Sequence, residues 1–363
     1  MEERKKIDRK KFWQNKRVLI TGHTGFKGSW LSLWLQTLGA IVLGFALDSP
    51  TEPSLFEIAS VEEKMKSVIG DVRDLTFMQT IFKEFQPDIV IHLAAQSLVR
   101  KSYKHPLATF STNVMGTANL LDCVRNTDSV RVAVCITSDK CYQNKEWVWG
   151  YRESDALGGY DPYSTSKACA ELVISSYRDS YFRPEMTDNH GVLLASTRAG
   201  NVVGGGDWAK DRLVPDIMRA MMEGHAVIIR NPHSTRPWQH VLEPLNGYLM
   251  LAEHLWAFGM EFSGPWNFGP NDGDVKPVSR ICDYLTRRWG EGASWQLDSE
   301  IHPHENTLLK LDCSKARQTL NWYPKLNLEA SLELIVEWFK AYQNKADMKL
   351  VTIDQIQRFE AIG

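Results

Sequence analysis

The chain has 363 residues, of which 43% are hydrophobic and 24% charged, a composition typical of a soluble globular protein with room for two domains. Its 42 basic and 44 acidic residues leave a net charge of -2, which gives no basic excess for binding a nucleic-acid backbone. No apolar run reaches the ~18 residues of a membrane span. The charged first residues lack the apolar stretch of a secretion signal, and six scattered cysteines suit a reducing compartment, so we expect a cytoplasmic protein.

Short apolar runs rich in β-branched residues, each followed by a turn, predict buried parallel strands. They span residues 17–21, 40–48, 88–95, 131–139 and 191–202. Helical periodicity lies between them, most clearly at residues 29–39, 106–126 and 163–182. Strands that alternate with helices predict a doubly wound, Rossmann-type parallel α/β sheet with helices on both faces.

The character of the sequence changes near residue 201, where glycine- and proline-rich loops separate short apolar segments such as 226–230 and 266–270. This pattern predicts a second, smaller α/β lobe that binds the substrate. We expect the cofactor-binding sheet domain at residues 12–200, with a returning helical segment near 237–258. The lobe would then comprise residues 201–236 and 259–345.

Three glycines, Gly22, Gly25 and Gly28, form a G-x-x-G-x-x-G turn between the first strand and the first helix. A tight turn and a close backbone approach both exclude a β-carbon, and the free amides at a helix start attract a pyrophosphate. Asp48 closes the second strand 20 residues after Gly28, where a carboxylate accepts hydrogen bonds from ribose hydroxyls and repels a 2′-phosphate. The pattern indicates NAD rather than NADP, with plain turn residues as the alternative.

Two further strand ends have residues that suit a dinucleotide. Asp71 and Val72 follow a short strand from which an acid reaches the adenine side of the cofactor. Ala94, Ala95 and Gln96 end the strand at 88–95, where two small residues let a flat cofactor lie against the backbone.

Tyr163 and Lys167 stand four residues apart at the start of a predicted helix, which places both on one face. Tyrosine has a free pKa of about 10, and a neighbouring ammonium together with a cationic nicotinamide ring stabilises its phenolate. The pair therefore suits removal of a hydroxyl proton while a hydride leaves the same carbon. Because Y-x-x-x-K spacing also occurs by chance, this prediction depends on the glycine turn that precedes it.

The stretches TGHTGFKG (21–28) and YSTSK (163–167) resemble the extended short-chain dehydrogenase/reductase family, whose nucleotide-sugar enzymes share both motifs. Other stretches are similar to the branch that dehydrates CDP-linked glucose: AAQSLVRKSY, STNVMGT, ITSDKCY, RAGNVVGGGDWAKDRLVPD and RPWQHVLEPL. The resemblance covers residues 12–338. It implies an NAD-dependent lyase that oxidises carbon 4 of the hexose, eliminates water across carbons 5 and 6, and returns the hydride to carbon 6. It also implies a place early in the biosynthesis of lipopolysaccharide O-antigen deoxysugars.

The resemblance assigns the elimination step to Ser138, Asp139 and Lys140, at positions where related dTDP-glucose dehydratases carry Thr-Asp-Glu. Asp139 would be the acid that helps the carbon-6 hydroxyl leave. Lys140 replaces the glutamate and is the candidate base at carbon 5, which requires burial beside another cation to lower its pKa. In the alternative, Lys140 stays charged and stabilises the enolate while Tyr163 or water moves the proton, and the plainest interpretation is a turn with a solvated charge.

The resemblance also implies which residues bind the sugar nucleotide. Asn201 and Arg236 would hold the diphosphate, and Arg212 would reach it unless it forms a surface ion pair. Ser97 and Arg100 would lie near the sugar.

Two segments carry weaker predictions. His304, next to Glu305, is a further substrate-side candidate whose role we do not derive. Trp147 and Trp149 would form either a lid over the site or the packing of a hairpin. We expect no metal, because the histidines near residue 302 lack further converging ligands.

The full set of expected cofactor-binding residues is Gly22, Thr24, Gly25, Phe26, Gly28, Asp48, Asp71, Val72, Ala94, Ala95, Gln96, Tyr163 and Lys167. In relatives, the helices at 106–126 and 163–182 pair across a two-fold axis as a four-helix bundle, which implies a homodimer or a tetramer. The rival functions are a nucleotide-sugar 4-epimerase, a dehydratase of another nucleotide sugar, and a non-catalytic NAD sensor.

Overall fold

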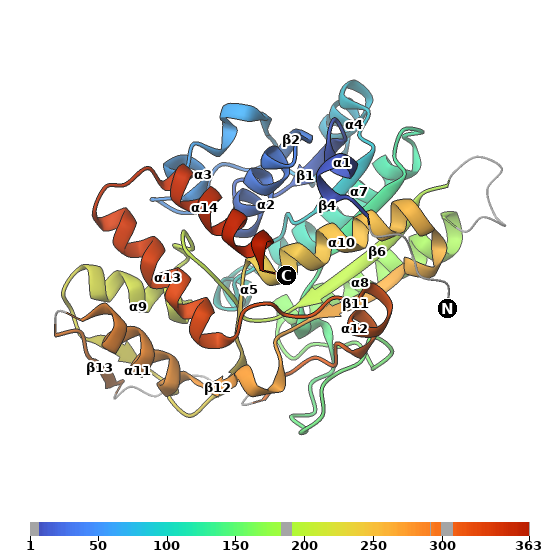
Figure 1. Ribbon diagram of the computed structural model, residues 1–363. Coiled ribbons are helices and arrows are strands. Elements are labelled where there is room, and N and C mark those ends of the chain that lie inside the picture. Colours follow the sequence, from blue (N-terminus) through green and yellow to red (C-terminus); the bar gives the residue numbers. More distant parts are fainter. Residues whose placement is uncertain (1–6, 183–190, 291, 299–307, 363) are drawn as a thin grey trace.

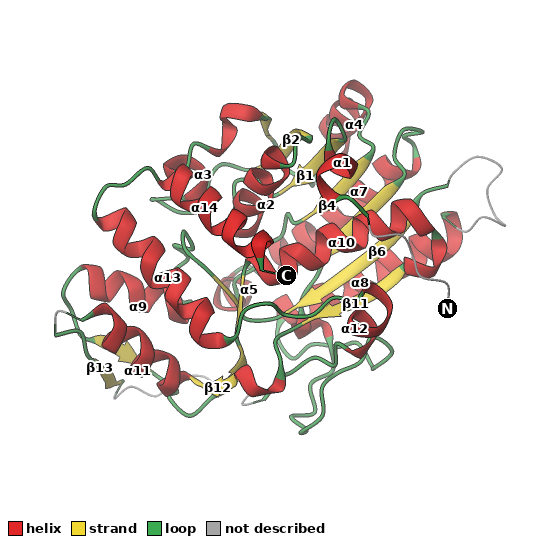
Figure 2. Ribbon diagram, in the orientation of Figure 1, coloured by secondary structure: helices red, strands yellow, loops and turns green. Residues whose placement is uncertain are grey.

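The computed structural model describes residues 7–182, 191–290, 292–298 and 308–362. Its main sheet has seven strands in the order β11-β6-β5-β4-β1-β2-β3, and every neighbouring pair is parallel (Figures 1 and 2). The strands are β1 (Arg17–Thr21), β2 (Ile41–Ala46), β3 (Lys66–Ile69), β4 (Ile89–His92), β5 (Val132–Ile136), β6 (Leu193–Ala199) and β11 (Gly264–Phe268). This topology confirms the predicted doubly wound, Rossmann-type α/β sheet.

Helices cover both faces of the sheet. One face packs against α2 (Phe26–Thr37) and α10 (Leu242–Phe258). The other face packs against a layer of three helices, α4 (Leu75–Phe85), α7 (Gly116–Arg125) and α8 (Pro162–Tyr181). Side chains of β1 alternate between two hydrophobic cores, with Val18 and Ile20 in one and Leu19 in the other. Because both faces are buried, the central strands are apolar along their whole length.

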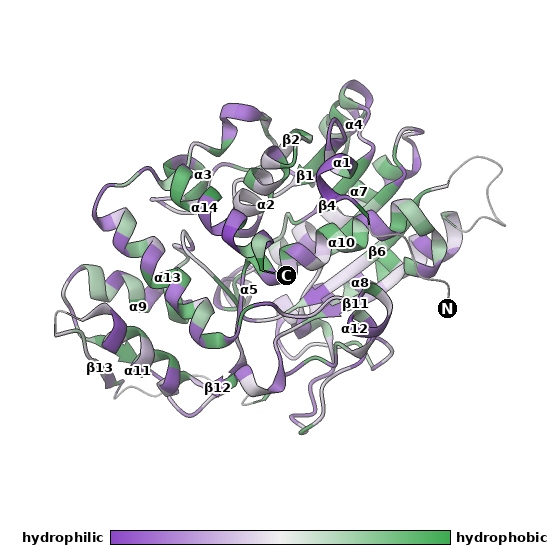
Figure 3. Cartoon of the chain, viewed as in Figure 1, coloured by the Kyte–Doolittle hydropathy of each residue, from purple (hydrophilic) through white to green (hydrophobic). Residues whose placement is uncertain are grey.

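A smaller lobe lies beyond the carboxyl edge of the sheet. Its elements α9 (Leu213–Met222), α11 (Val278–Trp289), β12 (Val275–Pro277) and β13 (Trp295–Leu297) gather at one end of the molecule, at the lower left of Figure 1. Green and purple stripes along α11 and α13 (Leu328–Gln343) mark their buried and solvent-facing sides (Figure 3). Ile217, Ile281 and Trp338 belong to the same core as Val18 of the sheet, so lobe and sheet share one apolar interior.

The remaining strands form two-stranded ladders. They are β7 (Val202–Val203) with β10 (Gln239–His240), β8 (Val227–Ile229) with β13, and β9 (Thr235–Pro237) with β12. The remaining α-helices are α1 (Arg9–Trp13), α3 (Leu55–Ile58), α5 (Val99–Lys104), α6 (Pro106–Phe110), α12 (Ser314–Leu320) and α14 (Met348–Ala361). Of the helices that the structure describes, none combines the length and the apolar character that a membrane span needs.

Two elements differ from the sequence prediction. The segment 266–270, expected in the lobe, contributes β11 to the main sheet, where the buried side chains of Trp266 and Phe268 extend the sheet beside β6. The helix expected at 106–126 is divided into α6, a π-helical turn (Ser111–Met115) and α7. The turn holds Asn113, whose side chain binds both backbone polar groups of Gln96 and the hydroxyl of Ser166.

Candidate active site

The predicted cofactor and catalytic residues meet at one edge of the sheet. The winding direction of the sheet reverses between β1 and β4, and open α/β sheets bind ligands outside the carboxyl ends of their strands at such a point. The glycine turn follows β1, residues 94–96 follow β4, and residues 138–140 follow β5. Three segments that are far apart in the sequence therefore meet at one edge of the sheet.

The glycine turn packs tightly against neighbouring backbone at the start of α2. Gly22 has φ of +78°, and a β-carbon there would lie 2.7 Å from the backbone nitrogen of Ala94. A β-carbon on Gly28 would lie 2.1 Å from the carbonyl oxygen of Gly22, so the chain can turn this tightly only with glycine. Gly25 caps α2 without a side-chain hydrogen bond, and Phe26 begins the helix. The first amides of α2 remain available, which fits the pyrophosphate of a dinucleotide.

The residues beside the turn differ in how firmly their surroundings hold them. The hydroxyl of Thr24 donates to the backbone at the end of β2 at 2.9 Å, and Asp48 is exposed two residues after that strand. Hydrogen bonds from the Arg73 guanidinium hold the pKa of Asp71 below its usual range, so that carboxylate is already engaged. Val72 is buried beneath the helix that carries Gly116.

The loop after β4 is held by its own side chains. The backbone nitrogen of Ala94 donates to the hydroxyl of Thr21 at 3.2 Å, and Ala95 is half-buried. The side-chain amide of Gln96 binds both backbone polar groups of Leu98. The side chain of Gln96 and both of its backbone polar groups are thus engaged within the protein, and they shape this loop.

Helix α8 presents the tyrosine and the lysine. Asp161 caps the helix by accepting from the backbone nitrogen of Ser164 at 3.0 Å, and Tyr163 and Lys167 are both buried. Burial raises the pKa of Tyr163 to about 12, although a hydrogen bond with Ser138 opposes this rise. Burial lowers the pKa of Lys167 to about 8, and its ammonium donates to the carbonyl of Ile136 at 3.2 Å.

The segment after β5 forms a short 3₁₀ turn, Asp139–Cys141. Asp139 is only 4% exposed, and its carboxylate accepts from the hydroxyl of Ser138 at 2.9 Å. A β-carbon on Gly200 would lie 1.9 Å from Oδ2 of Asp139, so the carboxylate rests directly against the backbone of the neighbouring strand end. The backbone nitrogen of Lys140 donates to the Ser138 hydroxyl, and the lysine side chain is half-buried.

Arg212 connects the lobe to the loop after β4. Its guanidinium donates to Asp207 at 2.9 Å and to the hydroxyl of Ser97 at 3.1 Å. It also acts on Tyr163, whose pKa its positive charge lowers. Arg100 forms an exposed ion pair with Asp211 of the lobe at 3.0 Å.

The structure adds three residues that sequence analysis missed. Lys27 lies among charges of the site, where burial and the cations Arg212 and Lys167 lower its pKa to about 8. Glu171 and Arg198 form a buried ion pair at 2.8 Å. The sequence signal that could have found Glu171 is its spacing, four residues after Lys167 on one helical face.

The structure describes some of the remaining predicted residues but not all of them. Asn201 has φ of 43° where the chain leaves the sheet, and the guanidinium of Arg236 donates to the carbonyl of Thr235. Trp147 stacks on Tyr151, whereas the neighbouring Trp149 is exposed. His304 and Glu305 lie outside the described residues. Within the described ranges, no three His, Cys, Asp or Glu side chains converge as metal ligands.

Comparison with known proteins places this arrangement among nucleotide-sugar enzymes. Residues 19–258 match the family described as GDP-mannose 4,6 dehydratase. The chain is 57% identical over 350 residues to the CDP-glucose 4,6-dehydratase of Salmonella typhimurium, covering 96% of this chain and 98% of that protein.

Solved structures agree on the fold. An epimerase from Methanothermobacter thermautotrophicus superposes with a TM-score of 0.80 at 23% identity, over 93% of this chain and 96% of that one. A dTDP-glucose 4,6-dehydratase from Streptomyces venezuelae, solved with NAD and TYD bound, superposes with a TM-score of 0.75 at 22% identity, over 91% and 98%.

Proposed function

The chain belongs to the GDP-mannose 4,6 dehydratase family, and we propose that it is an NAD-dependent CDP-glucose 4,6-dehydratase, a lyase. It would convert CDP-D-glucose to CDP-4-keto-6-deoxy-D-glucose and water. The observation that carries this proposal is the 57% identity, spread over 96% of the chain, to an enzyme of that name. The buried carboxylate of Asp139 beside Tyr163 supports it, because an elimination needs an acid that an epimerisation does not.

The geometry of the glycine turn supports NAD as the cofactor, since close-packed glycines and the uncapped start of α2 suit a pyrophosphate. When bound, NAD would take up a hydride from carbon 4 of the sugar and return it to carbon 6, so that the net reaction is redox-neutral. The exposed carboxylate of Asp48 would bind the ribose hydroxyls and disfavour NADP. Gln96 would lie against the cofactor and shape the loop beside it, as its side chain and its backbone polar groups are engaged within the protein.

Tyr163 would take the proton of the carbon-4 hydroxyl. Its buried position raises its pKa to about 12, so the phenolate needs positive charge close by. Arg212 already acts in this direction, and Lys167 of the same helix would add to it as long as it stays protonated. Ser138, which hydrogen-bonds Tyr163, would orient the phenol toward the substrate hydroxyl.

Removal of the carbon-4 hydrogens leaves a ketone, which acidifies the proton on carbon 5. Asp139 would protonate the carbon-6 hydroxyl as it leaves, from its fixed place against Gly200. Lys140, one residue further along the same turn, would accept the carbon-5 proton.

The lobe would hold the nucleotide. Arg212 and Ser97, which are joined by a hydrogen bond between the lobe and the loop after β4, would bind the sugar and its diphosphate. Asn201, Arg236 and Arg100 would complete the diphosphate and sugar contacts, and His304 is proposed from the sequence alone.

We further propose a cytoplasmic homodimer that serves O-antigen deoxysugar synthesis. The supporting observation for the dimer is a set of exposed apolar side chains on α5, α6, α8 and the π-helical turn: Tyr103, Leu107, Met115 and Leu172.

Mass spectrometry of the product tests the function. Incubation of the protein with NAD and CDP-glucose in heavy water is expected to remove about 18 mass units as water and to place one solvent deuteron at carbon 5. The dTDP, UDP and GDP sugars, run in parallel, should remain unchanged. An unchanged mass with inverted carbon 4 would make the protein an epimerase, and dehydration of another sugar would correct the donor.

The same measurement tests Lys140. The Lys140→Ala variant should lose deuterium incorporation at carbon 5 by about 100-fold, as expected for loss of a general base. Unimpaired incorporation would remove Lys140 from that role.

A further inference from the structure

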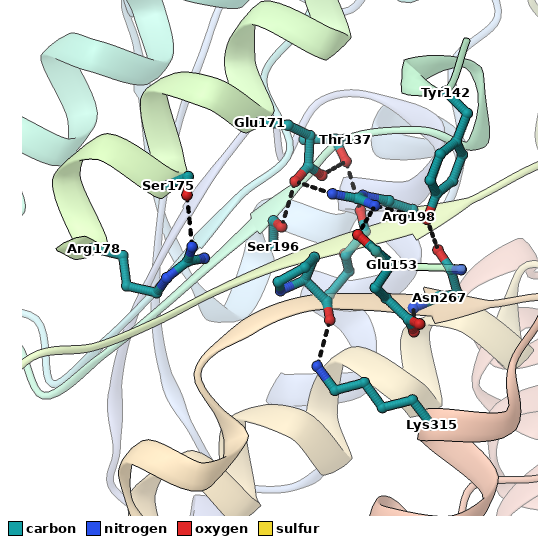
Figure 4. A network of polar contacts seen from close by, with 12 residues as sticks. Thr137, Tyr142, Glu153, Glu171, Ser175, Arg178, Ser196, Arg198, Asn267 and Lys315 are labelled. Carbon is teal, nitrogen blue, oxygen red and sulfur yellow. Dashed lines mark hydrogen bonds and ion pairs between the residues drawn. The ribbon is translucent and has the colours of Figure 1, made fainter. Parts of the chain in front are cut away.

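A buried ion pair lies one helical turn from the lysine of the site. Glu171 follows Lys167 by four residues and Tyr163 by eight, so all three lie on one face of α8. Its carboxylate accepts hydrogen bonds from Ser196 and Arg198, each at 2.8 Å, and from Thr137 (Figure 4). The three donors lie on β6 or directly after β5.

The partner of this carboxylate extends the network away from the helix. Arg198 is 2% exposed and donates both to Glu171 and to the hydroxyl of Tyr142, at 2.7 Å. Tyr142 in turn donates to the side chain of Asn267 on β11 at 2.8 Å (Figure 4). The network thus connects α8 with β6, with the segment that follows Asp139, and with the edge of the sheet. It fixes the carboxylate of Glu171 from several sides.

Stability alone does not account for such a pair. Removing two charges from water is costly, and buried ion pairs replaced by well-packed apolar residues often leave a protein as stable as before. Burial opposes the charge on Glu171, yet Arg198 and the surrounding donors hold the pKa of this carboxyl below its usual range. Glu171 therefore stays ionised in the interior, one helical turn from Lys167.

Lys167 is the group that this charge affects. Burial lowers the pKa of Lys167 to about 8, and the carboxylate of Glu171 is the main influence that raises it. The other titratable groups that face Lys167 come from several packed elements: Cys135 of β5, Cys141 of the 3₁₀ turn, His92 of β4 and Lys27 of α2. Burial leaves both cysteines as thiols and His92 as the neutral ring at neutral pH. Glu171 is consequently the fixed counter-charge of the lysine.

We propose that Glu171, held in place by Arg198, is a positioning residue that keeps Lys167 charged and seated next to Tyr163. The role in turnover rests on the proposed function, because only a proton transfer through Tyr163 makes the charge of Lys167 matter. Glu171 touches no substrate in this scheme and acts through Lys167 alone.

NMR of the whole protein, with ¹³C-labelled lysine Cε, measures the charge of Lys167 directly, and Lys167→Arg assigns its signal. In Glu171→Gln, the midpoint for deprotonation of Lys167 should fall by about one pH unit or more. The pH above which kcat declines should fall together with this midpoint, since the neutral amine of Lys167 no longer stabilises the phenolate of Tyr163. An unchanged midpoint in folded Glu171→Gln protein overturns the proposal.

Two further variants separate charge from structure. Ser196→Ala removes one hydrogen bond from the same carboxylate and keeps its charge, so its midpoint should match the wild type. If Glu171→Gln does not fold because Arg198 is left unpaired, the double variant Glu171→Gln with Arg198→Met removes both charges and should show the lowered midpoint. The NMR midpoint is read without turnover, so it decides the role of Glu171 even if CDP-glucose is not the substrate.

Discussion

The proposed acid of the site owes its position to a residue without a side chain. Asp139 lies between the hydroxyl of Ser138, which donates to Oδ1, and the backbone of Gly200, where a β-carbon would come within 1.9 Å of Oδ2. Real β-carbons do not approach oxygen so closely, and the obstructing atom belongs to a buried carboxyl group that Ser138 holds from its other side. Any side chain at position 200 must therefore move the carboxylate.

Gly200→Ala should lower kcat by about 100-fold, the scale on which a misplaced general acid acts, with a smaller effect on KM. Overpacking of this kind also costs about 1–3 kcal/mol of folding free energy, which thermal unfolding would measure. Gly273→Ala is the control, because nothing lies within 4 Å of its added methyl group. The loss should not add to that of Asp139→Asn in the double variant, and full additivity would show that Gly200 acts elsewhere.

Sequence reasoning reached those site residues whose signal is local. The glycine turn, Tyr163 with Lys167, and the segment 138–140 each carry their chemistry within a few neighbouring positions. Contacts between distant positions left no such signal: Gly200 meets Asp139 across 61 positions, and Arg198 meets Glu171 across 27. A buried arginine in an apolar strand indicates an ion pair only when the fold shows which carboxylate lies next to it.

Among the secondary-structure elements, the short strands were the most difficult to predict from the sequence. The strand at 17–21 was predicted with its observed bounds, since an apolar run between charged residues and a glycine marks both ends. Strand β11 was assigned to the lobe because five residues carry no signal for which sheet they join; pairing with β6 decides that. The π-helical turn was missed because helical periodicity continues through it, and only the contact of Asn113 with Gln96 distinguishes it.

Helix α10 shows how one buried carboxyl joins two elements. Glu243, in the first turn of α10, accepts from the backbone nitrogens of Lys325 and Leu326 with the same oxygen, at 2.9 and 2.7 Å. These donors belong to the segment that leads into α13. Burial raises the pKa of Glu243 to about 7, although the two backbone donors oppose the rise. Since the folded pKa lies above the unfolded value, this group stabilises the fold most below about pH 4.5, and that contribution is lost as pH rises through about 7.

Glu243→Gln keeps an acceptor for the two backbone donors and cannot ionise. The variant should therefore gain stability over the wild type by roughly 3 kcal/mol between pH 4.5 and pH 8, an upper figure for a shift of this size. Urea unfolding at several pH values measures the difference. The exposed Glu62→Gln variant should show no such trend, and a parallel trend in both variants would contradict the assignment.

At the scale of the whole molecule, several exposed apolar side chains lie on helices that pack against one another. Leu107 of α6 is 84% exposed and Leu172 of α8 is 59% exposed, and these two helices pack against each other. Tyr103 and Met115, on adjoining segments, are also more than half exposed. Single exposed leucines need no explanation, but neighbouring ones on the helices behind the active site are typical of a surface that a second copy covers. A two-fold axis would use each of these residues twice.

The double variant Leu107→Glu with Leu172→Glu should be a monomer at micromolar concentration, whereas the wild type is proposed to be a dimer. Burying one leucine side chain is worth about 1.5–3 kcal/mol, and the symmetric interface would lose four of them, while the added carboxylates repel across the axis. Sedimentation velocity would report the change. Leu350→Glu, on the exposed face of α14, is the matched control and should keep the oligomer of the wild type. If the double variant remains a dimer, the subunit interface lies on another face. If the wild type is a tetramer and the double variant a dimer, these helices form only one of its two interfaces.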